Sequence, residues 1–530
     1  MGKVASCRWV EMIQGSRCGA LVAVAAAATV GLIWAQNPGP QRPRQVDAIA
    51  EAQGPPATTG ARPEQNKTDH DRSPVFDAKN AKSNSTDAGT QPKAGKISGF
   101  DFYRDPLNSD RPNQTPDEIR NTETANRPKV MAAQRKLLES RYNLNPKLDP
   151  QDRMSRGKPL VVGPTARLKQ GLTWERLAEM APAAIRDADA FPYPALVHPL
   201  QANGGQLFPR MQIDMFPRLE RFDVEFDLPE AFLPEFPPPI FLTNRPELGD
   251  VSRGEVVSIN NYYRLFKDLL TPVQLDGLRM LLTPFPQEEF NPTDDRKSPE
   301  PSLGVTCLDC HVNGHTTGQF HLSPDMRPQE RRFRLDTTSL RGVQNQQVHG
   351  SKRSLRSVED FTEFEQRTAY FNGDHISADK KGTHQPNRTN QVSLMAQMQN
   401  MIDFPPAPKL DPLGRLDPAK ATQQELMGEK VFFGKGRCAE CHAPPAFMDQ
   451  QMHDLHVERF YKPALINGQL NGPDGPIKTF TLRGIKDSPP YLHDGRLITL
   501  DDTVEFFNLV LQLKLNQAEK DALVAYMRQL

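Results

Sequence analysis

The sequence predicts a mainly α-helical protein: two small helical domains at the C-terminal end, preceded by an irregular proline-rich segment and a disordered N-terminal linker. Three observations favour this organisation. The pattern Cys-x-x-Cys-His occurs twice, at 307–311 and 438–442. Helix-capping patterns recur near both copies, and little of the surrounding sequence alternates as half-buried strands do. The 49 prolines are about twice the ordinary share.

Length and composition exclude several classes of protein. At 530 residues and 59.4 kDa, the chain is too long for one packed core and predicts two to four domains or long unpacked segments. Lys+Arg and Asp+Glu number 65 each, and this balance argues against a broad nucleic-acid-binding surface. A mean hydropathy of −0.61 excludes a polytopic membrane protein.

The first residues, 1–35, resemble an export signal. A basic leader containing Lys3, Arg8 and Arg17 precedes an uncharged, mostly apolar run at 19–35. This run is just long enough to span a bilayer, so it is either a signal cleaved after Ala35 or an uncleaved anchor. A buried core helix is the alternative. We expect an exported, periplasmic protein that residues 19–35 tether to the inner membrane if they are not cleaved.

Between this leader and the first Cys-x-x-Cys-His motif we expect two regions. Residues 36–125 form a disordered linker, because Phe76 is the only aromatic residue between positions 36 and 98 and too little apolar surface is present to offset the entropy of ordering. Residues 126–300 form an irregular region that packs on the following domains, since its prolines prevent long helices. One helix is expected over 129–142.

Three capping boxes predict helices nearer the C-terminus. Thr-Pro-Val-Gln at 271–274 opens one that Pro284 ends, Thr422 and Glu425 open one that ends at Gly434, and 516–519 opens the terminal helix. The predicted domains are 301–415 and 416–530, each containing one Cys-x-x-Cys-His motif.

Cys-x-x-Cys-His is the attachment signature of c-type haem. Two thiols on one turn reach the two vinyl groups and form thioether bonds, and the adjacent histidine ligates the iron from the proximal side. The sequence therefore predicts two cytochrome c-like haem domains and two covalently bound haems c. The predicted attachment and ligand residues are Cys307, Cys310 and His311 for the first haem, and Cys438, Cys441 and His442 for the second, with His311 and His442 as iron ligands.

Two other uses of these cysteines were weighed. Four thiolates could bind a structural zinc ion, but zinc would not require a histidine directly after each pair. A redox-active dithiol would need one pair in a βαβ setting, which the local sequence does not suggest. The remaining cysteines, Cys7 and Cys18, lie in the leader.

The second half of the chain resembles the di-haem cytochrome c peroxidase family, which includes MauG-type enzymes. The segments that carry the resemblance around the second motif are 428–434, 480–485, 490–496 and 500–504, with weaker echoes at 340–343 and 350–355. In this family the N-terminal haem reacts with hydrogen peroxide, and the C-terminal haem passes electrons inward from a small donor protein. Members also bind calcium between the haem domains, and the sequence does not assign such ligands here.

The chain departs from the family at three positions. The Met or Tyr ligand expected after His493 is replaced by Phe507, so the second iron is five-coordinate or takes another ligand. The peroxidatic Glu is replaced by Ser357, and Glu359 is the expected substitute as a proton shuttle. The relay tryptophan is missing from the haem region. Other ligand candidates for the second haem are Met448, Met452, His453 and His456; distal candidates for the first are His315, His321 and His349.

The leading hypothesis is a periplasmic di-haem c-type cytochrome of the peroxidase superfamily with peroxide- or oxygen-linked oxidoreductase activity. Its candidate catalytic residues are Glu359 and His349. Its expected partners are a small electron-donor protein of the cytochrome c or cupredoxin type and hydrogen peroxide or oxygen, and no nucleic acid. The alternatives are a non-enzymatic di-haem electron carrier, favoured by Ser357 and Phe507, and a di-haem oxygenase whose substrate pocket is covered by 155–300.

Overall fold

The computed structural model describes residues 116–196, 226–283, 306–318, 320–322, 334–352, 355–365, 388–466, 469–470 and 475–530. All of them lie in one compact unit, Lys93–Leu530. The predicted export signal at 1–35, most of the predicted linker at 36–125, and Pro284 lie outside the described residues.

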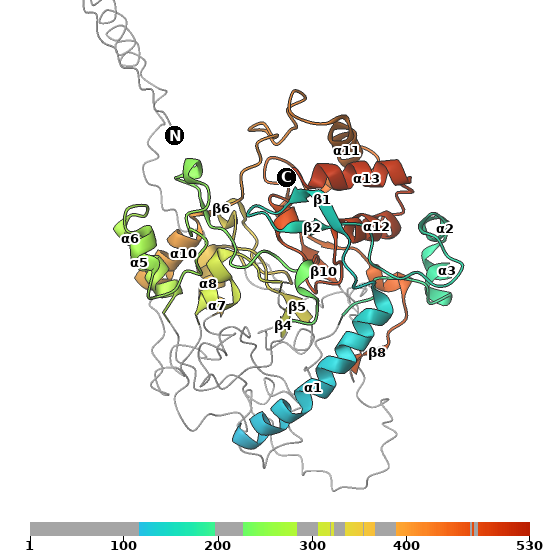
Figure 1. Ribbon diagram of the computed structural model, residues 1–530, viewed down its shortest axis with the longest axis horizontal. Coiled ribbons are helices and arrows are strands. Elements are labelled where there is room, and N and C mark those ends of the chain that lie inside the picture. The colour runs from blue at the N-terminus through green and yellow to red at the C-terminus, as the bar shows by residue number, and fades with distance from the viewer. Residues whose placement is uncertain are drawn as a thin grey trace, which may run out of the picture. The chain divides into compact units, whose positions relative to one another are not determined.

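The described part of the chain is partly helical and has little strand, in agreement with the predicted helical class (Figure 1). The helices before the second Cys-x-x-Cys-His motif are α1 (Pro116–Arg141), α2 (Trp174–Glu179), α3 (Pro182–Asp187), α5 (Tyr262–Phe266), α6 (Pro272–Leu281), α7 (Cys307–Cys310), α8 (Val358–Phe364), α10 (Ser393–Gln399) and α11 (Gln423–Phe433). Those after it are α12 (Leu500–Val510) and α13 (Gln517–Met527).

Within the described ranges the strands form five two-stranded antiparallel pairs, each too short to make a sheet-based core. The pairs are β1 (Leu148–Arg153) with β2 (Pro159–Val161), β3 (Phe241–Leu242) with β6 (Ile402–Asp403), β4 (Phe320–Leu322) with β5 (Arg334–Asp336), β7 (Met452–Asp454) with β10 (Pro476–Lys478), and β8 (Leu465–Ile466) with β9 (Gln469–Leu470).

The three predicted capping boxes are confirmed. Thr271 caps α6 together with Gln274. Thr422 and Glu425 do the same for α11, which ends at Gly434 as predicted. The box at 516–519 opens α13. Each box satisfies backbone N–H groups that have no partner within their own helix, which fixes the start of the helix.

One core is built around α6 and α10. It joins apolar residues of 240–282 with Leu308 and with residues up to Ile402. The two helices cross closely at Gly277, where an added Cβ atom would lie 2.1 Å from the backbone oxygen of Leu394. Only glycine permits that approach, so this position sets the spacing of the two helices.

A second core is built around α11, α12 and α13. It joins the C-terminal helices with apolar residues of α1, α2, α3 and the segments 190–196 and 228–233. The helices α11 and α13 cross at Gly428, where a Cβ atom would lie 1.9 Å from the backbone oxygen of Ala522. Figure 1 shows these C-terminal helices grouped together, with α5, α6, α8 and α10 forming the other group.

The proline-rich region is thus divided between the two cores. Apolar residues of 138–196 and 228–233 pack with the C-terminal helices, whereas those of 240–282 pack with Leu308 of the first Cys-x-x-Cys-His motif. The predicted domain boundaries at 300 and 415 stay a prediction. The two cores divide the chain in another way, because the core of the C-terminal helices also contains residues that precede the first motif. Burial of Phe232, Ile240 and Leu242 agrees with the expectation that this region packs as irregular chain over a core.

The predicted helix at 129–142 was too short. In the structure α1 begins at Pro116, inside the predicted linker, and ends at Arg141. Its N-terminal half is polar, so hydrophobic periodicity gave no signal there. Its C-terminal end carries the buried residue Leu138, which belongs to the second core.

None of the helices in the described ranges combines the length and apolar character needed to cross a membrane. The apolar run at 19–35 lies outside those ranges, so its predicted role stays a prediction.

Candidate haem-binding sites

The first motif forms a single helical turn, α7, followed by its histidine. The backbone N–H of His311 donates to the carbonyl of Cys307 over 3.2 Å, which brings both thiols and the imidazole to one turn. Thr306 precedes the turn and bonds through its hydroxyl to the buried Asp309 over 2.8 Å. The Nδ1 atom of His311 donates to the carbonyl oxygen of Thr338 over 2.7 Å. Such a bond fixes the ring orientation and tautomer of a metal-ligating histidine.

The second motif repeats this geometry on a 3₁₀ turn, Cys438–Glu440. The backbone N–H of His442 donates to the carbonyl of Cys438 over 2.8 Å. Its Nδ1 atom donates to the carbonyl oxygen of Phe447 over 3.0 Å. Both motif histidines are therefore oriented in the same way, by a backbone carbonyl at Nδ1, as a proximal iron ligand requires.

None of the four motif cysteines forms a disulfide bond. Burial raises the pKa of Cys307 and of Cys438 to about 12, so these thiols are protonated at neutral pH. The cysteines of the two motifs do not gather into a four-thiolate cluster anywhere in the described ranges. That arrangement does not fit one structural zinc ion, whereas two separate Cys-x-x-Cys-His turns fit two covalently attached haem groups.

A cavity lies next to the first motif. Its lining includes Thr338, whose carbonyl holds His311, and the apolar side chains of Leu340, Val358 and Phe361. Polar lining comes from Gln346, His349, Gln399 and Lys478. The cavity encloses about 20 Å³, room for a water-sized group, and combines apolar walls with a few convergent polar groups.

Of the three distal candidates for the first haem, His349 combines burial, a place in the cavity lining and a ring nitrogen without a partner. It is 5% exposed, it lines the cavity, and its Nε2 atom has no hydrogen-bond partner. Burial, with a smaller effect of Lys478, lowers the pKa of His349 to about 4. Its ring is therefore neutral at pH 7 and can accept a proton.

The other two candidates do not share this geometry. His315 uses both ring nitrogens, Nδ1 to Ser339 over 2.7 Å and Nε2 to the carbonyl of Asp487 over 3.0 Å. It is a buried structural residue with a lowered pKa, caused by burial first and then by Arg341. His321 lies on β4, and the position of its side chain is outside what the structure describes.

Ser357 and Glu359 lie at the start of α8. The hydroxyl of Ser357 accepts from the backbone N–H of Asp360 over 3.0 Å, so this side chain caps the helix. That role explains a serine here in structural terms. Glu359 is half-buried and is not among the residues lining the cavity, to which α8 contributes Val358 and Phe361. Its predicted catalytic role stays a prediction.

The predicted ligand candidates near the second motif differ in their surroundings. Phe507 packs against the second core as an apolar residue. Met448 is buried, whereas the side chain of His456 is 62% exposed and lies near Asp454 and Glu458.

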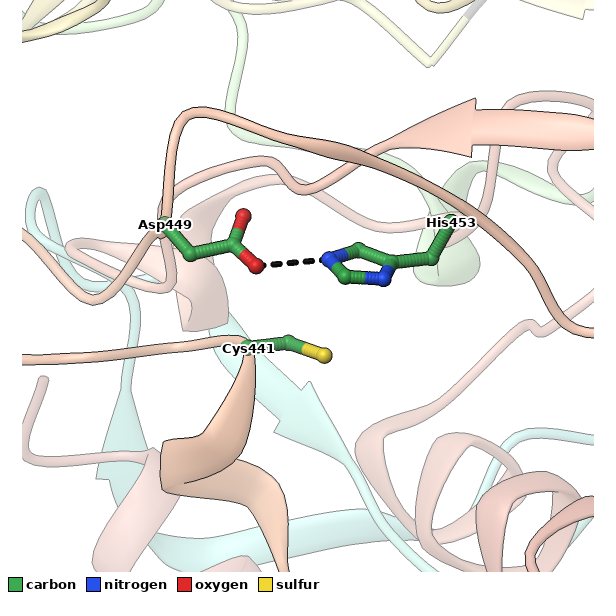
Figure 2. Close-up of side chains that lie close together, drawn as sticks. All are labelled: Cys441, Asp449 and His453. Carbon is green, nitrogen blue, oxygen red and sulfur yellow. Dashed lines mark hydrogen bonds and ion pairs between the residues drawn. The ribbon is translucent and has the colours of Figure 1, made fainter.

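His453 has a defined partner. Its Nε2 atom donates to Asp449 over 2.6 Å, and Figure 2 shows this pair lying beside the thiol of Cys441. Although burial opposes it, His453 lowers the pKa of Asp449. The three side chains lie close enough to hold a metal ion. A thioether bond at Cys441 would remove the thiolate from such a set, so metal and covalent haem exclude each other there.

Asp487 links the surroundings of the two motifs. Its carboxylate accepts from Arg341 over 3.2 Å and from the backbone and hydroxyl of Ser155, and its carbonyl accepts from His315. The Arg341 and Asp487 side chains are each 3% exposed, so this is a buried ion pair. Arg483 donates hydrogen bonds to the backbone carbonyls of Leu530 and Pro405.

Asp494 lies in the Pro-Tyr-Leu-His-Asp-Gly segment and is buried. It is 1% exposed and pairs with Arg496 over 2.8 Å. Although burial opposes it, Arg496 and His493 lower the pKa of Asp494 to about 2. The Pro-Tyr-Leu-His-Asp-Gly segment is therefore a buried structural turn that also bonds to the backbone of Leu196.

Residues 340–352 and 355–364 have the same local structure as residues 482–494 and 497–506. Gly342 and Gly484 both have positive φ and open a 3₁₀ turn. An isolated bridge follows in each, His349 with Leu355 and Tyr491 with Leu497. Ser357 and Thr499 then cap α8 and α12. Every such position in the second copy follows its counterpart by the same number of residues.

These observations define the chain as one with two c-type haem attachment sequences in helical cores. No protein-family profile matches it. A cytochrome-c peroxidase, IdrP2, of Denitromonas iodatirespirans is 28% identical over 22% of this chain and 41% of the relative. The cytochrome c551 peroxidase of Nitrosomonas europaea is 31% identical over 26% of this chain and 43% of the relative. The methylamine utilization protein MauG of Methylorubrum extorquens is 28% identical over 15% of this chain and 24% of the relative.

The chain is thus a relative of the cytochrome c peroxidase and MauG family, as the sequence motifs indicated. The matches span less than half the length of these relatives.

Proposed function

We propose that this protein is a periplasmic di-haem c-type cytochrome that performs peroxide-linked redox chemistry. One haem is attached at Cys307 and Cys310 with His311 as proximal ligand. The other is attached at Cys438 and Cys441 with His442. The observation that carries the proposal is the repeated motif geometry, in which each motif histidine is oriented at Nδ1 by a backbone carbonyl.

The first site is proposed as the one that reacts with peroxide. A haem bound at the first motif would supply an iron that binds peroxide, and the two haems would supply the two electrons that reduce it to water. The chain supplies the proton chemistry, because His349 offers a neutral ring with an unpartnered Nε2 atom in the adjacent cavity. A positioned base contributes about 10²- to 10⁴-fold to such reactions. The second site, with Phe507 in place of a ligand, is proposed to pass electrons to the first.

The remaining parts of the proposal rest on the sequence. Export follows from the leader at 1–35, and thioether attachment of haem outside the bacterial inner membrane agrees with it. The electron donor is proposed to be a small cytochrome c or cupredoxin. A calcium ion between the haem sites is a further expectation carried by the family resemblance.

The test starts with the mature protein made in a host that attaches haem c. Denaturing electrophoresis with haem staining should show covalent haem, and the pyridine haemochrome spectrum should give two haems per chain. The variants Cys307→Ala/Cys310→Ala and Cys438→Ala/Cys441→Ala should each retain one. Zinc without covalent haem would refute the proposal.

Peroxide reactivity separates the enzyme from an electron carrier. Hydrogen peroxide should oxidise the half-reduced protein rapidly and stoichiometrically. Absorbance and low-temperature EPR measure this oxidation. The reduced protein should also bind carbon monoxide, because one iron is open. Inert spectra with both irons six-coordinate would instead identify an electron carrier.

A further inference from the structure

The cavity beside the first motif is lined by residues from two parts of the chain, the segment after the first motif and the segment after the second motif, which are called here the first and the second haem segment. His349 and Gln346 belong to the chain that follows the first motif. Lys478 and Phe480 belong to β10 and the segment after it, beyond the second motif. The backbone N–H of Lys478 donates to the carbonyl of Ser351 over 3.0 Å, which fixes this strand against the first segment. The cavity wall is therefore shared by the two haem segments.

Gln346 connects the two basic side chains. The backbone of Gln346 makes a hydrogen bond with the ring of His349. Because Nε2 of His349 has no partner, this bond is made by Nδ1. A carbonyl partner places the proton on Nδ1 and leaves the lone pair on Nε2. The side-chain oxygen of Gln346 accepts a hydrogen bond from the ammonium group of Lys478.

Lys478 is an unusual residue for this position. It is 4% exposed, and its ammonium lies 4.7 Å from the centre of the Phe480 ring. No carboxylate forms an ion pair with it in the described part of the chain. Lysine is almost never fully buried unless it is paired. An apolar side chain would fill the same space at lower cost, so packing alone does not account for a lysine here.

We propose that Lys478 is a positioning residue for the first haem site: its ammonium group, held by Gln346, keeps the His349 ring neutral, with the Nε2 lone pair available in the cavity. This proposal rests on the proposed function only in placing a haem at the first motif. It assigns to the second haem segment a direct part in the proton chemistry of the first.

The charges around His349 agree in sign with this role. Lys478 lowers the pKa of His349, whereas Glu359 and Asp360 on α8 raise it, and burial has the largest effect. A protonated ring cannot accept a proton, so the base works only above its pKa. Removing the cation leaves the two acidic groups unopposed, and the ring then protonates at higher pH. His349 does not in turn lower the pKa of Lys478, because the His349 ring is already neutral in the pH range in which Lys478 loses its proton.

Cyanide binding to the ferric, fully haem-loaded protein tests this directly. Hydrogen cyanide must lose its proton when cyanide binds the iron, so a neighbouring base accelerates binding. The second-order rate constant should be measured by stopped-flow absorbance from pH 3.5 to 8. It should fall at low pH with a midpoint near the His349 pKa of about 4. His349→Leu should slow binding at pH 7 by about 10²-fold or more.

The deciding variant is Lys478→Met, which retains the length of the side chain and removes its charge. Its midpoint should move to higher pH, whereas Lys478→Arg should retain the wild-type midpoint. Lys462→Met, which removes an exposed lysine, is the matched control and should change nothing. Covalent haem content and circular dichroism confirm that each variant is folded and loaded.

Two results would overturn the proposal: an unchanged midpoint in Lys478→Met, or an unchanged rate in His349→Leu. Failure of the proposed function gives a different pattern. A protein that does not react with peroxide, yet shows the cyanide midpoint shift, would refute peroxide chemistry and leave the role of Lys478 intact.

Discussion

Replacing Lys478 by methionine should make the protein more stable. Burial lowers the pKa of Lys478 from 10.5 to about 7, which means that the folded state disfavours the charged form. Below pH 7 this cost is fully present and amounts to roughly 5 kcal/mol, since one pKa unit corresponds to about 1.4 kcal/mol. Methionine removes the charge but leaves the buried Gln346 oxygen without its donor, which costs about 1–3 kcal/mol. The expected net gain is about 2–4 kcal/mol at pH 6.

The pH dependence has a definite sign. A lysine whose folded pKa lies below its unfolded pKa destabilises the protein at low pH, and stability recovers as pH rises from about 7 to 10.5. The advantage of Lys478→Met should therefore be largest at pH 6 and shrink toward pH 10. Urea unfolding of the haem-loaded wild type and variant at pH 6, 8 and 10 measures it.

Lys462→Met is again the control, with an expected change within about 0.5 kcal/mol because this side chain is exposed. A variant less stable than wild type at pH 6 would refute the reasoning. That result would mean that a carboxylate, such as a haem propionate, pairs with Lys478 in the loaded protein. Higher stability combined with a shifted cyanide midpoint would show that the lysine is retained for chemistry at a cost in stability.

Three further predictions concern the sites and the cores. His349→Leu should slow the reaction with hydrogen peroxide by about 10²-fold or more, whereas Glu359→Gln, outside the cavity lining, should change it less than tenfold; the reverse order in stopped-flow traces would identify Glu359 as the proton shuttle. Asp487→Asn should lower the free energy of unfolding, measured in urea, by about 3–5 kcal/mol, because Arg341 is left buried without its carboxylate partner. Asp411→Asn on the exposed surface serves as the control. Gly428→Ala should destabilise the protein by about 1–3 kcal/mol or more, because the added methyl group overpacks against the backbone of Ala522, although alanine is normally favoured in a helix by about 1 kcal/mol. The control Met427→Ala, on the exposed side of α11, should be near neutral. A Gly428→Ala variant more stable than wild type would contradict the close helix crossing.

The helices that could be predicted from sequence were those with a local signal. Capping boxes identified the starts of α6, α11 and α13 because the cap and its partner lie three residues apart on the chain. The start of α12 has the same signal, Thr499 with Asp502, but this stretch was used only as a family motif. The short helices α2, α3 and α5 have five or six residues each and depend on tertiary packing, which a local pattern does not contain.

The site residues divide in the same way. The motif cysteines and histidines were found because haem attachment imposes a fixed local spacing. His349 was named with Glu359 as a candidate catalytic residue, and the structure separates it from the other distal candidate His315 by showing which ring nitrogens are occupied. Lys478 was missed, since nothing local marks a lysine that enters a cavity formed by residues far away in sequence.

The repeated segments explain why one fold can carry two different sites. The glycine-initiated turn, the bridge and the hydroxyl-capped helix are shared, because these features depend on backbone geometry and are independent of the chemistry at the bridge position. At that position the first copy has His349 and the second has Tyr491. Burial lowers the pKa of the histidine and raises that of the tyrosine, so at pH 7 one is a neutral proton acceptor and the other a neutral phenol that does not ionise. The proton acceptor lies beside the first motif, so the backbone plan is common to both copies and the proton chemistry is confined to one of them.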